Sequence, residues 1–169
     1  FELARYDVSL PMGDQVLILI PHLAGLGMGV GDGGVIVDQQ PLIVVAATHL
    51  VSSAVLGAAG IWHTLRCPKD LSETTGRAKK FDFTWDDPKK LTFILGHHLI
   101  FLGLGVIAFV EWARVHGIYD ASLGAVRTVE PNIDLGMVWG YQTNFLTISS
   151  LEDVMGGHAV LAFILTIGG

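Results

Sequence analysis

The chain has 169 residues, of which 51% are hydrophobic and only 15% are charged, and its mean hydropathy is +0.54. A soluble domain of this length usually carries about a quarter charged residues, so the composition favours a membrane protein. The net charge of -6 argues against a nucleic-acid partner, and the single cysteine excludes a disulfide framework or a cysteine-based metal site.

Residues 1–40 are predicted to form a loop on the non-cytoplasmic side of the membrane. Within them, residues 15–31 are uncharged but contain Pro21 and four glycines, which indicates an interfacial loop segment rather than a span. A formal GxGxxG match begins at Gly29. Dinucleotide binding needs a strand before this motif and a helix after it, and Pro41 follows too soon, so we interpret the glycines as a tight turning loop.

The first predicted span is 42–65, an uncharged run that extends about 36 Å as a helix, with Pro41 suited to its first turn. It contains His49 and His63, fourteen positions apart, which places both rings near one face and about 21 Å apart along the axis. Small residues around them, such as Gly60, allow a helix or a flat ring to approach closely.

Histidine inside a span is costly and indicates function. Neutral imidazole is a good axial ligand for a metal at the centre of a macrocycle, so the pair predicts two macrocycle sites at different depths. The alternative is that each ring hydrogen-bonds a neighbouring helix. We favour ligation because two histidines share one face.

The connection 66–90 contains seven of the ten Lys and Arg residues. The positive-inside rule therefore predicts that 66–90 is cytoplasmic and that the loops 1–40 and 114–156 lie on the opposite side.

The second predicted span is 91–113, preceded by an Asp87–Pro88 helix start. His97 and His98 are adjacent in it and hence about 100° apart, so they cannot face the same neighbour. One is a ligand candidate, and the other is either structural or holds an extra ligand.

The third predicted span is 157–169 and onward, opening with His158, and Ser150 and the nearby acids offer N-capping chemistry before it. We expect the natural sequence to continue past Gly169, with a further histidine fourteen positions after His158. His116 and His22 fall in loop or interface positions, where a solvated histidine is expected.

Four segments of the chain carry a resemblance to a known family: PMGDQVLILIPHLAGLGMGVGDGG, HLVSSAVLGAAGIWHTL, FTWDDPKKLTFILGHHLIFLG and SSLEDVMGGH. They resemble the iron-stress-induced chlorophyll-binding protein of cyanobacteria, the prochlorophyte-type accessory antennae and the smaller inner-antenna subunit of photosystem II. The resemblance implies an all-α, polytopic fold of six helices in three pairs. This chain would be a single transmembrane antenna domain reaching from the tail of the first helix into the fourth.

The resemblance also implies the ligands and the setting. Histidines matching His49, His63, His98 and His158 would be axial to chlorophyll magnesium. His97 differs from the photosystem II subunit but matches the paired histidines of the iron-stress protein, and with the short segment GYQTNFLTISSLED it favours an accessory antenna. The pigments would be chlorophyll a, with b or d as alternatives, and β-carotene between the helices.

We therefore predict a light-harvesting protein of the cyanobacterial thylakoid membrane, not an enzyme. It would pass excitation energy to a photosystem I or photosystem II core and assemble with copies of itself in a ring or arc. The alternative is a di-haem b-type electron-transfer protein, which needs a second helix with a similarly spaced histidine pair; the span with His97 and His98 lacks one.

Overall fold

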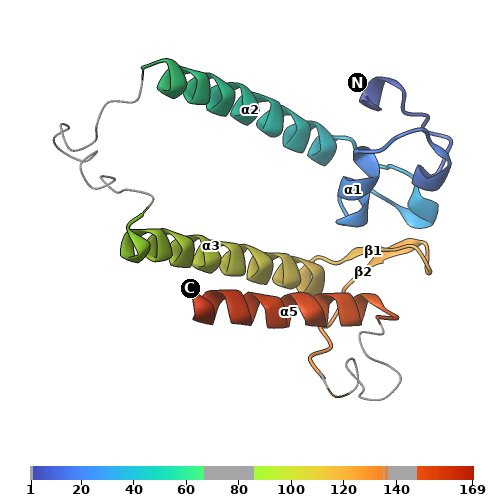
Figure 1. Cartoon of the computed structure of the whole chain (residues 1–169). Coiled ribbons are helices and arrows are strands. Elements are labelled where there is room, and N and C mark those ends of the chain that lie inside the picture. The colour runs from blue at the N-terminus through green and yellow to red at the C-terminus, as the bar shows by residue number, and fades with distance from the viewer. Residues whose placement is uncertain (1, 67–85, 135, 137–147) are drawn as a thin grey trace.

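The computed structural model describes residues 2–66, 86–134, 136 and 148–169. Three long helices dominate it: α2 (Gln40–Arg66), α3 (Pro88–Val115) and α5 (Leu151–Gly168) (Figure 1). All three are long and apolar enough to cross a membrane. The prediction of a polytopic helical fold is confirmed. Most of the loop 66–90, with Cys67, lies outside the described residues, as does most of the segment GYQTNFLTISSLED.

Short elements complete the described chain. They are the 3-10 helices η1 (Glu2–Ala4), η2 (Met12–Asp14) and η3 (Asp32–Gly34), the helix α1 (Ile20–Gly25) and the strands β1 (Ile118–Asp120) and β2 (Ala125–Arg127). The strands pair antiparallel, with Tyr119 opposite Val126, and form a hairpin that the sequence patterns did not predict. Its turn uses Gly124, whose φ of 69° is a conformation that glycine adopts without strain.

The starts of α3 and α5 follow the expected capping chemistry. The Asp87 carboxylate accepts hydrogen bonds from the backbone N–H groups of Lys89 and Lys90, at 3.1 and 3.3 Å, and Pro88 occupies the first turn. Ser150 caps α5 by accepting from the Asp153 N–H at 3.3 Å. The α5 helix consequently begins at Leu151 and not at 157.

The start of this helix, ahead of the predicted span, has a physical reason. Glu152 and Asp153 lie inside the first turn of α5, where negative charge is favourable beside the positive end of the helix dipole, so they do not delay the helix. The other two helices also exceed their predicted spans, by one or a few residues at each end.

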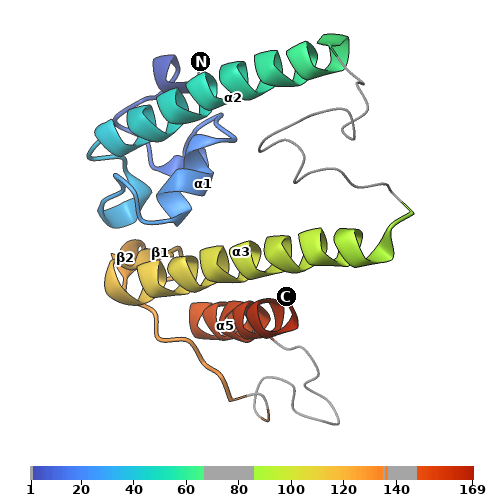
Figure 2. The same ribbon diagram turned by 90° about the vertical axis from the view of Figure 1, so that its left-hand side faces the viewer.

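α3 and α5 lie side by side and antiparallel (Figures 1 and 2). In this contact Gly96 and Gly103 of α3, seven positions apart, lie against Gly169 and Ala162 of α5, which are also seven positions apart. A Cβ atom built on Gly103 would lie only 3.0 Å from the Ala162 carbonyl oxygen. The helix backbones can approach this closely only because the contact residues are small.

The N-terminal segment folds around the start of α2. Its hydrophobic cluster consists of Met12, Leu17, Ile20, Ala24, Val30, Ile36 and Leu42, with Tyr119 and Val126 of the hairpin packed against it. Gly29 has a φ of 67°, and Val30 and Ile36 form an isolated antiparallel bridge, so the glycines form the tight turning loop expected from the sequence. Leu42 is 1% exposed, whereas the rest of α2 is almost entirely exposed.

Candidate ligand histidines on the membrane helices

Four of the five candidate histidines use the same ring nitrogen to contact their own helix. The Nδ1 atom lies 2.8 Å from the Val45 carbonyl in His49, 2.9 Å from that of Phe93 in His97, 2.7 Å from that of Ile94 in His98 and 2.8 Å from that of Val154 in His158. A carbonyl oxygen only accepts, so Nδ1 carries the proton. Nε2, on the opposite side of the ring, is then the nitrogen whose lone pair can bind a metal.

His63 is held differently. Its ring meets the Trp62 indole edge-on, with centroids 5.2 Å apart, and the Arg66 guanidinium lies 5.6 Å from the centre of the same indole. Within the described part of the chain, His63 makes no Nδ1 bond to a helix carbonyl. This ring is therefore positioned by an aromatic contact rather than by its backbone.

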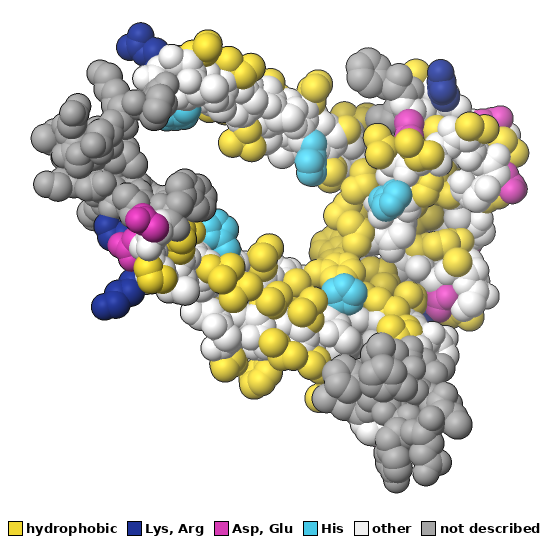
Figure 3. All heavy atoms as spheres, viewed as in Figure 1, with side chains coloured by type: hydrophobic (Ala, Val, Ile, Leu, Met, Phe, Trp, Pro, Cys, Tyr) yellow, Lys and Arg dark blue, Asp and Glu magenta, His cyan; other side chains and the backbone are white. Residues whose placement is uncertain are grey.

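The flank of α2 that carries His49 and His63 is open. Both side chains are exposed, Leu56 between them is 71% exposed, and Gly57 and Gly60 have nothing within 4 Å of a built Cβ. Figure 3 shows histidine side chains spread along the visible face, over the long helices and the N-terminal segment, with hydrophobic side chains between them. An exposed apolar flank with imidazoles at two depths suits apolar ligands bound from the membrane side.

The tandem histidines of α3 both point away from α5. His98 and His97 are five and six positions before Gly103, which places them about 140° and 120° around the helix from that contact residue, on opposite flanks. His97 lies against Phe93, with centroids 4.2 Å apart. The two rings therefore face different surroundings, as their adjacency in the sequence required.

His158 is the most enclosed of the five. Its side chain is partly buried, and its ring packs edge-on against Phe109 of α3 with centroids 5.4 Å apart. Because α5 begins at Leu151, His158 lies two turns inside the helix and not at its opening. The site is thus formed by the α3–α5 pair.

The candidate histidines are dispersed. Among the described residues, no group of three or more His, Cys, Asp or Glu side chains could hold a metal ion. Among those residues, each candidate histidine therefore stands outside any such cluster of donor side chains. That arrangement suits a metal whose other ligands come from a macrocycle and not a bare ion, which needs several protein donors.

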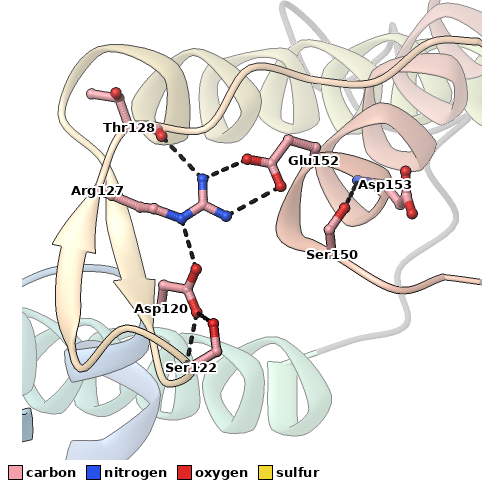
Figure 4. A network of polar contacts seen from close by, with 7 residues as sticks. All are labelled: Asp120, Ser122, Arg127, Thr128, Ser150, Glu152 and Asp153. Carbon is pink, nitrogen blue, oxygen red and sulfur yellow. Dashed lines mark hydrogen bonds and ion pairs between the residues drawn. The ribbon is translucent and has the colours of Figure 1, made fainter.

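A polar network at the start of α5 escaped the sequence analysis (Figure 4). Arg127 of β2 pairs with Asp120 of β1 at 2.7 Å and with Glu152 of α5 at 2.5 Å. Asp120 also accepts from the Ser122 hydroxyl at 2.6 Å. Asp153, which is buried, accepts from the Asn132 amide at 2.9 Å. Glu152 and Asp153 were expected to cap the helix, and they also tie it to the preceding loop.

The hydrogen bonds of this network favour the charged forms. The Ser122 hydroxyl, followed by the Arg127 guanidinium, lowers the pKa of Asp120 from 3.8 to about 2. Glu152, followed by Asp120, raises the pKa of Arg127 above its usual range. The hairpin is thereby fastened to α5 by fixed charges. Neither charge pattern nor spacing could reveal this, since 25 positions separate Arg127 from Glu152.

Comparison with known proteins also relates this chain to photosynthetic proteins. The family model described as Photosystem II protein matches residues 1–169. The divinyl chlorophyll a/b light-harvesting protein PcbC of Prochlorococcus marinus is 64% identical over 100% of this chain and 49% of its own length. In another strain of that organism, PcbB is 60% identical over 100% of this chain and 49% of its own, and PcbA is 59% identical over 99% and 46%.

The chain spans about half the length of the curated relatives it matches. The matches cover each long helix and the segments before and after it, including the segments that carry the histidines. The chain therefore belongs to the photosystem II protein family and, within it, to the prochlorophyte light-harvesting proteins.

Proposed function

We propose that the protein is a chlorophyll-binding antenna of the thylakoid membrane that absorbs light and passes excitation energy to a photosystem. The observation that carries this proposal is the repeated histidine geometry: a helix carbonyl fixes the proton on Nδ1, which leaves the lone pair on Nε2, and these rings stand on largely apolar helices. Relatives named as chlorophyll a/b light-harvesting proteins supply the pigment class.

In this proposal His49, His63, His98 and His158 are each axial to one chlorophyll magnesium, and His97 holds a further chlorophyll. A magnesium ion in a tetrapyrrole has four ring nitrogens and accepts one axial donor, so a single imidazole per site is sufficient. The Nδ1 bond fixes the rotation of each ring and, through it, the tilt of the bound macrocycle.

The protein's part in energy transfer is positional. Fixed ligands hold the pigments at constant separations and angles, and the apolar helices keep water away from them. The axial nitrogen does not contact the edge substituents of the macrocycle, so these histidines accept a- and b-type chlorophylls alike. No group of side chains is assigned a catalytic role.

The surroundings of the pigments are also part of the proposal. β-Carotene would occupy apolar space between helices, and the exposed flank of α2 would contact pigments, lipid or other helices of the whole protein. The partners would be a photosystem I or photosystem II core and further copies of the protein in a ring or arc. The loops 1–40 and 114–156 would be lumenal and 66–90 cytoplasmic.

The decisive experiment is purification of the full-length protein from a chlorophyll-synthesising host. Its absorption spectrum should show the red and blue bands of chlorophyll, and extraction with chromatography should identify the pigments. Fluorescence excitation should show that light absorbed by carotenoid reaches chlorophyll. A purified, folded protein without chlorophyll, or one with the sharp reduced bands of b-type haem, would refute the proposal.

A further inference from the structure

A pocket of about 510 Å³ lies where the N-terminal segment, the start of α2 and the end of α3 meet. Met28, Pro41, Val44 and Val45 form apolar parts of its wall, and Trp112 and His116 form another. Its volume is within the range of small-molecule sites. None of the candidate histidines named above lines it.

The ring of His116 is held in place at this pocket. It stacks on the Trp112 indole with centroids 4.0 Å apart and planes inclined by 17°. Its Nδ1 lies 3.0 Å from the Gly117 carbonyl oxygen and so donates to it. Trp112 is itself anchored, since its Nε1 donates to the Leu26 carbonyl at 2.8 Å. His116 is exposed, as its place in the sequence predicts, but these contacts fix the orientation of its ring.

This arrangement repeats the feature shared by the candidate ligands. A backbone carbonyl fixes the proton on Nδ1 and leaves Nε2 as the acceptor, beside a largely apolar pocket. The carboxylate in the pocket wall, Asp38, already accepts from the backbone N–H of Gln40 at 2.9 Å, at the start of α2. A lone imidazole with apolar walls does not suit a bare cation, which needs several donors, but it suits a metal already held by a planar macrocycle.

We propose that His116 is the axial ligand of a further magnesium tetrapyrrole, a chlorophyll seated at this pocket. The inference rests on the proposed antenna function and adds a site to it. The macrocycle would contact Val44 and Val45 of α2, which line the pocket, while Trp112 packs against the face of the histidine ring and holds its orientation.

The position of the pocket gives the new site a neighbour. Val45 lines the pocket, and its carbonyl oxygen also accepts the Nδ1 proton of His49. Val45 and His49 are four positions apart, about 6 Å along the axis of α2, so the two proposed sites adjoin the same turn of this helix. Pigments on adjoining sites couple, so removing the His116 pigment should also shift the absorption of the pigment at His49.

The test compares two substitutions in the full-length protein from a chlorophyll-synthesising host. His116→Phe keeps an aromatic ring against Trp112 but removes the nitrogen donor. His22→Phe is the matched control, because His22 has the same type of Nδ1 bond, to the Ile18 carbonyl at 2.8 Å, but does not line this pocket. His116→Phe should lose one chlorophyll per chain and change the red absorption band. His22→Phe should lose none.

Equal chlorophyll counts in His116→Phe and the unsubstituted protein would overturn the proposal, and so would an equal loss in both variants. A second variant, Trp112→Phe, guards against a purely structural effect: it removes the bond to Leu26 but keeps a ring beside His116, and it should retain the pigment. Loss in Trp112→Phe without loss in His116→Phe would also contradict it. Absence of chlorophyll from the unsubstituted protein would instead refute the antenna function itself.

Discussion

At the scale of single residues, the helix backbone fixes the tautomer of the histidines proposed as ligands. The carbonyl oxygen four residues earlier accepts a hydrogen bond from the Nδ1–H of His49, His98 and His158, so no second side chain is needed to fix the tautomer. Such a histidine can stand on a helix surface that is otherwise apolar. A histidine whose Nδ1 found no such acceptor would rotate more freely and hold its macrocycle less precisely.

Removing one of these ligands should remove one pigment. His49→Leu keeps an apolar side chain of moderate size on the exposed flank of α2 but has no donor atom, so we expect the full-length protein to lose one chlorophyll per chain. The adjacent Thr48→Ala is the control, since the Thr48 hydroxyl also bonds its own helix, to the Val44 carbonyl at 2.8 Å. Pigment counts after extraction provide the measurement. An unchanged count in His49→Leu would remove His49 from the ligand set.

The lowered pKa of Asp120 predicts how the stability of the protein depends on pH. Its pKa is lowered to about 2 in the folded protein, so its ion pair with Arg127 contributes stability that is complete above about pH 4 and disappears as the pH falls towards 2. Asp120→Asn should therefore lower the thermal unfolding midpoint at pH 7 and pH 5, and the difference should shrink near pH 2. Asp14→Asn, an exposed carboxylate outside the network, should show no such pattern. A difference that grows on acidification would contradict this account.

At the scale of elements, the sequence predicted the long helices well because their signals are local. Uncharged runs, Pro41, Pro88 and the Asp87 cap lie within or beside each helix. The hairpin and the polar network depend on contacts that local signals cannot encode. Each hairpin strand has only three residues, too few for an alternating pattern. Arg127 and its partner Glu152 are far apart in the sequence and meet only in the folded chain.

The start of α5 shows how a local signal can also mislead. The predicted span was confined to the apolar run from 157, whereas the helix itself begins at Leu151 and includes the two acids in its first turn, where they are stabilising. The histidine tautomers and the pocket at His116 could not be predicted from the sequence either, because both depend on where the residues lie in three dimensions. The ligand identities of the five histidines remain predictions, resting on spacing, resemblance and the geometry of Nδ1.

The close contact of α3 and α5 should be sensitive to one methyl group. In Gly103→Ala the new Cβ would lie 2.9 Å from the Thr166 backbone nitrogen and 3.0 Å from the Ala162 carbonyl oxygen, so the helices must separate. Overpacking of this kind costs about 1–3 kcal/mol. Gly105→Ala is the matched control, because a Cβ there meets nothing within 4 Å. Unfolding midpoints of the two variants measure the difference. Equal stability would mean that this contact is looser than the structure shows.

At the scale of the whole molecule, the short elements gather at one end of the long helices. The N-terminal segment, the hairpin and the start of α5 lie together at that end, where α2 begins and α3 ends (Figure 1). The His116 pocket and the Arg127 network are both found there. The positive-inside rule predicts which compartment each end faces, because the seven basic residues of 66–90 favour the cytoplasm.

Thiol labelling tests this orientation, because the chain has a single cysteine, Cys67. In sealed thylakoids with the cytoplasmic face outward, a membrane-impermeant reagent should label Cys67 without detergent. The matched variant carries Leu123→Cys in a Cys67→Ser background; Leu123 is 67% exposed in the hairpin turn, at the other end of the helices. It should be labelled only after the membrane is opened or inverted. The reverse pattern would turn the whole topology over and would place the His116 pocket on the cytoplasmic side.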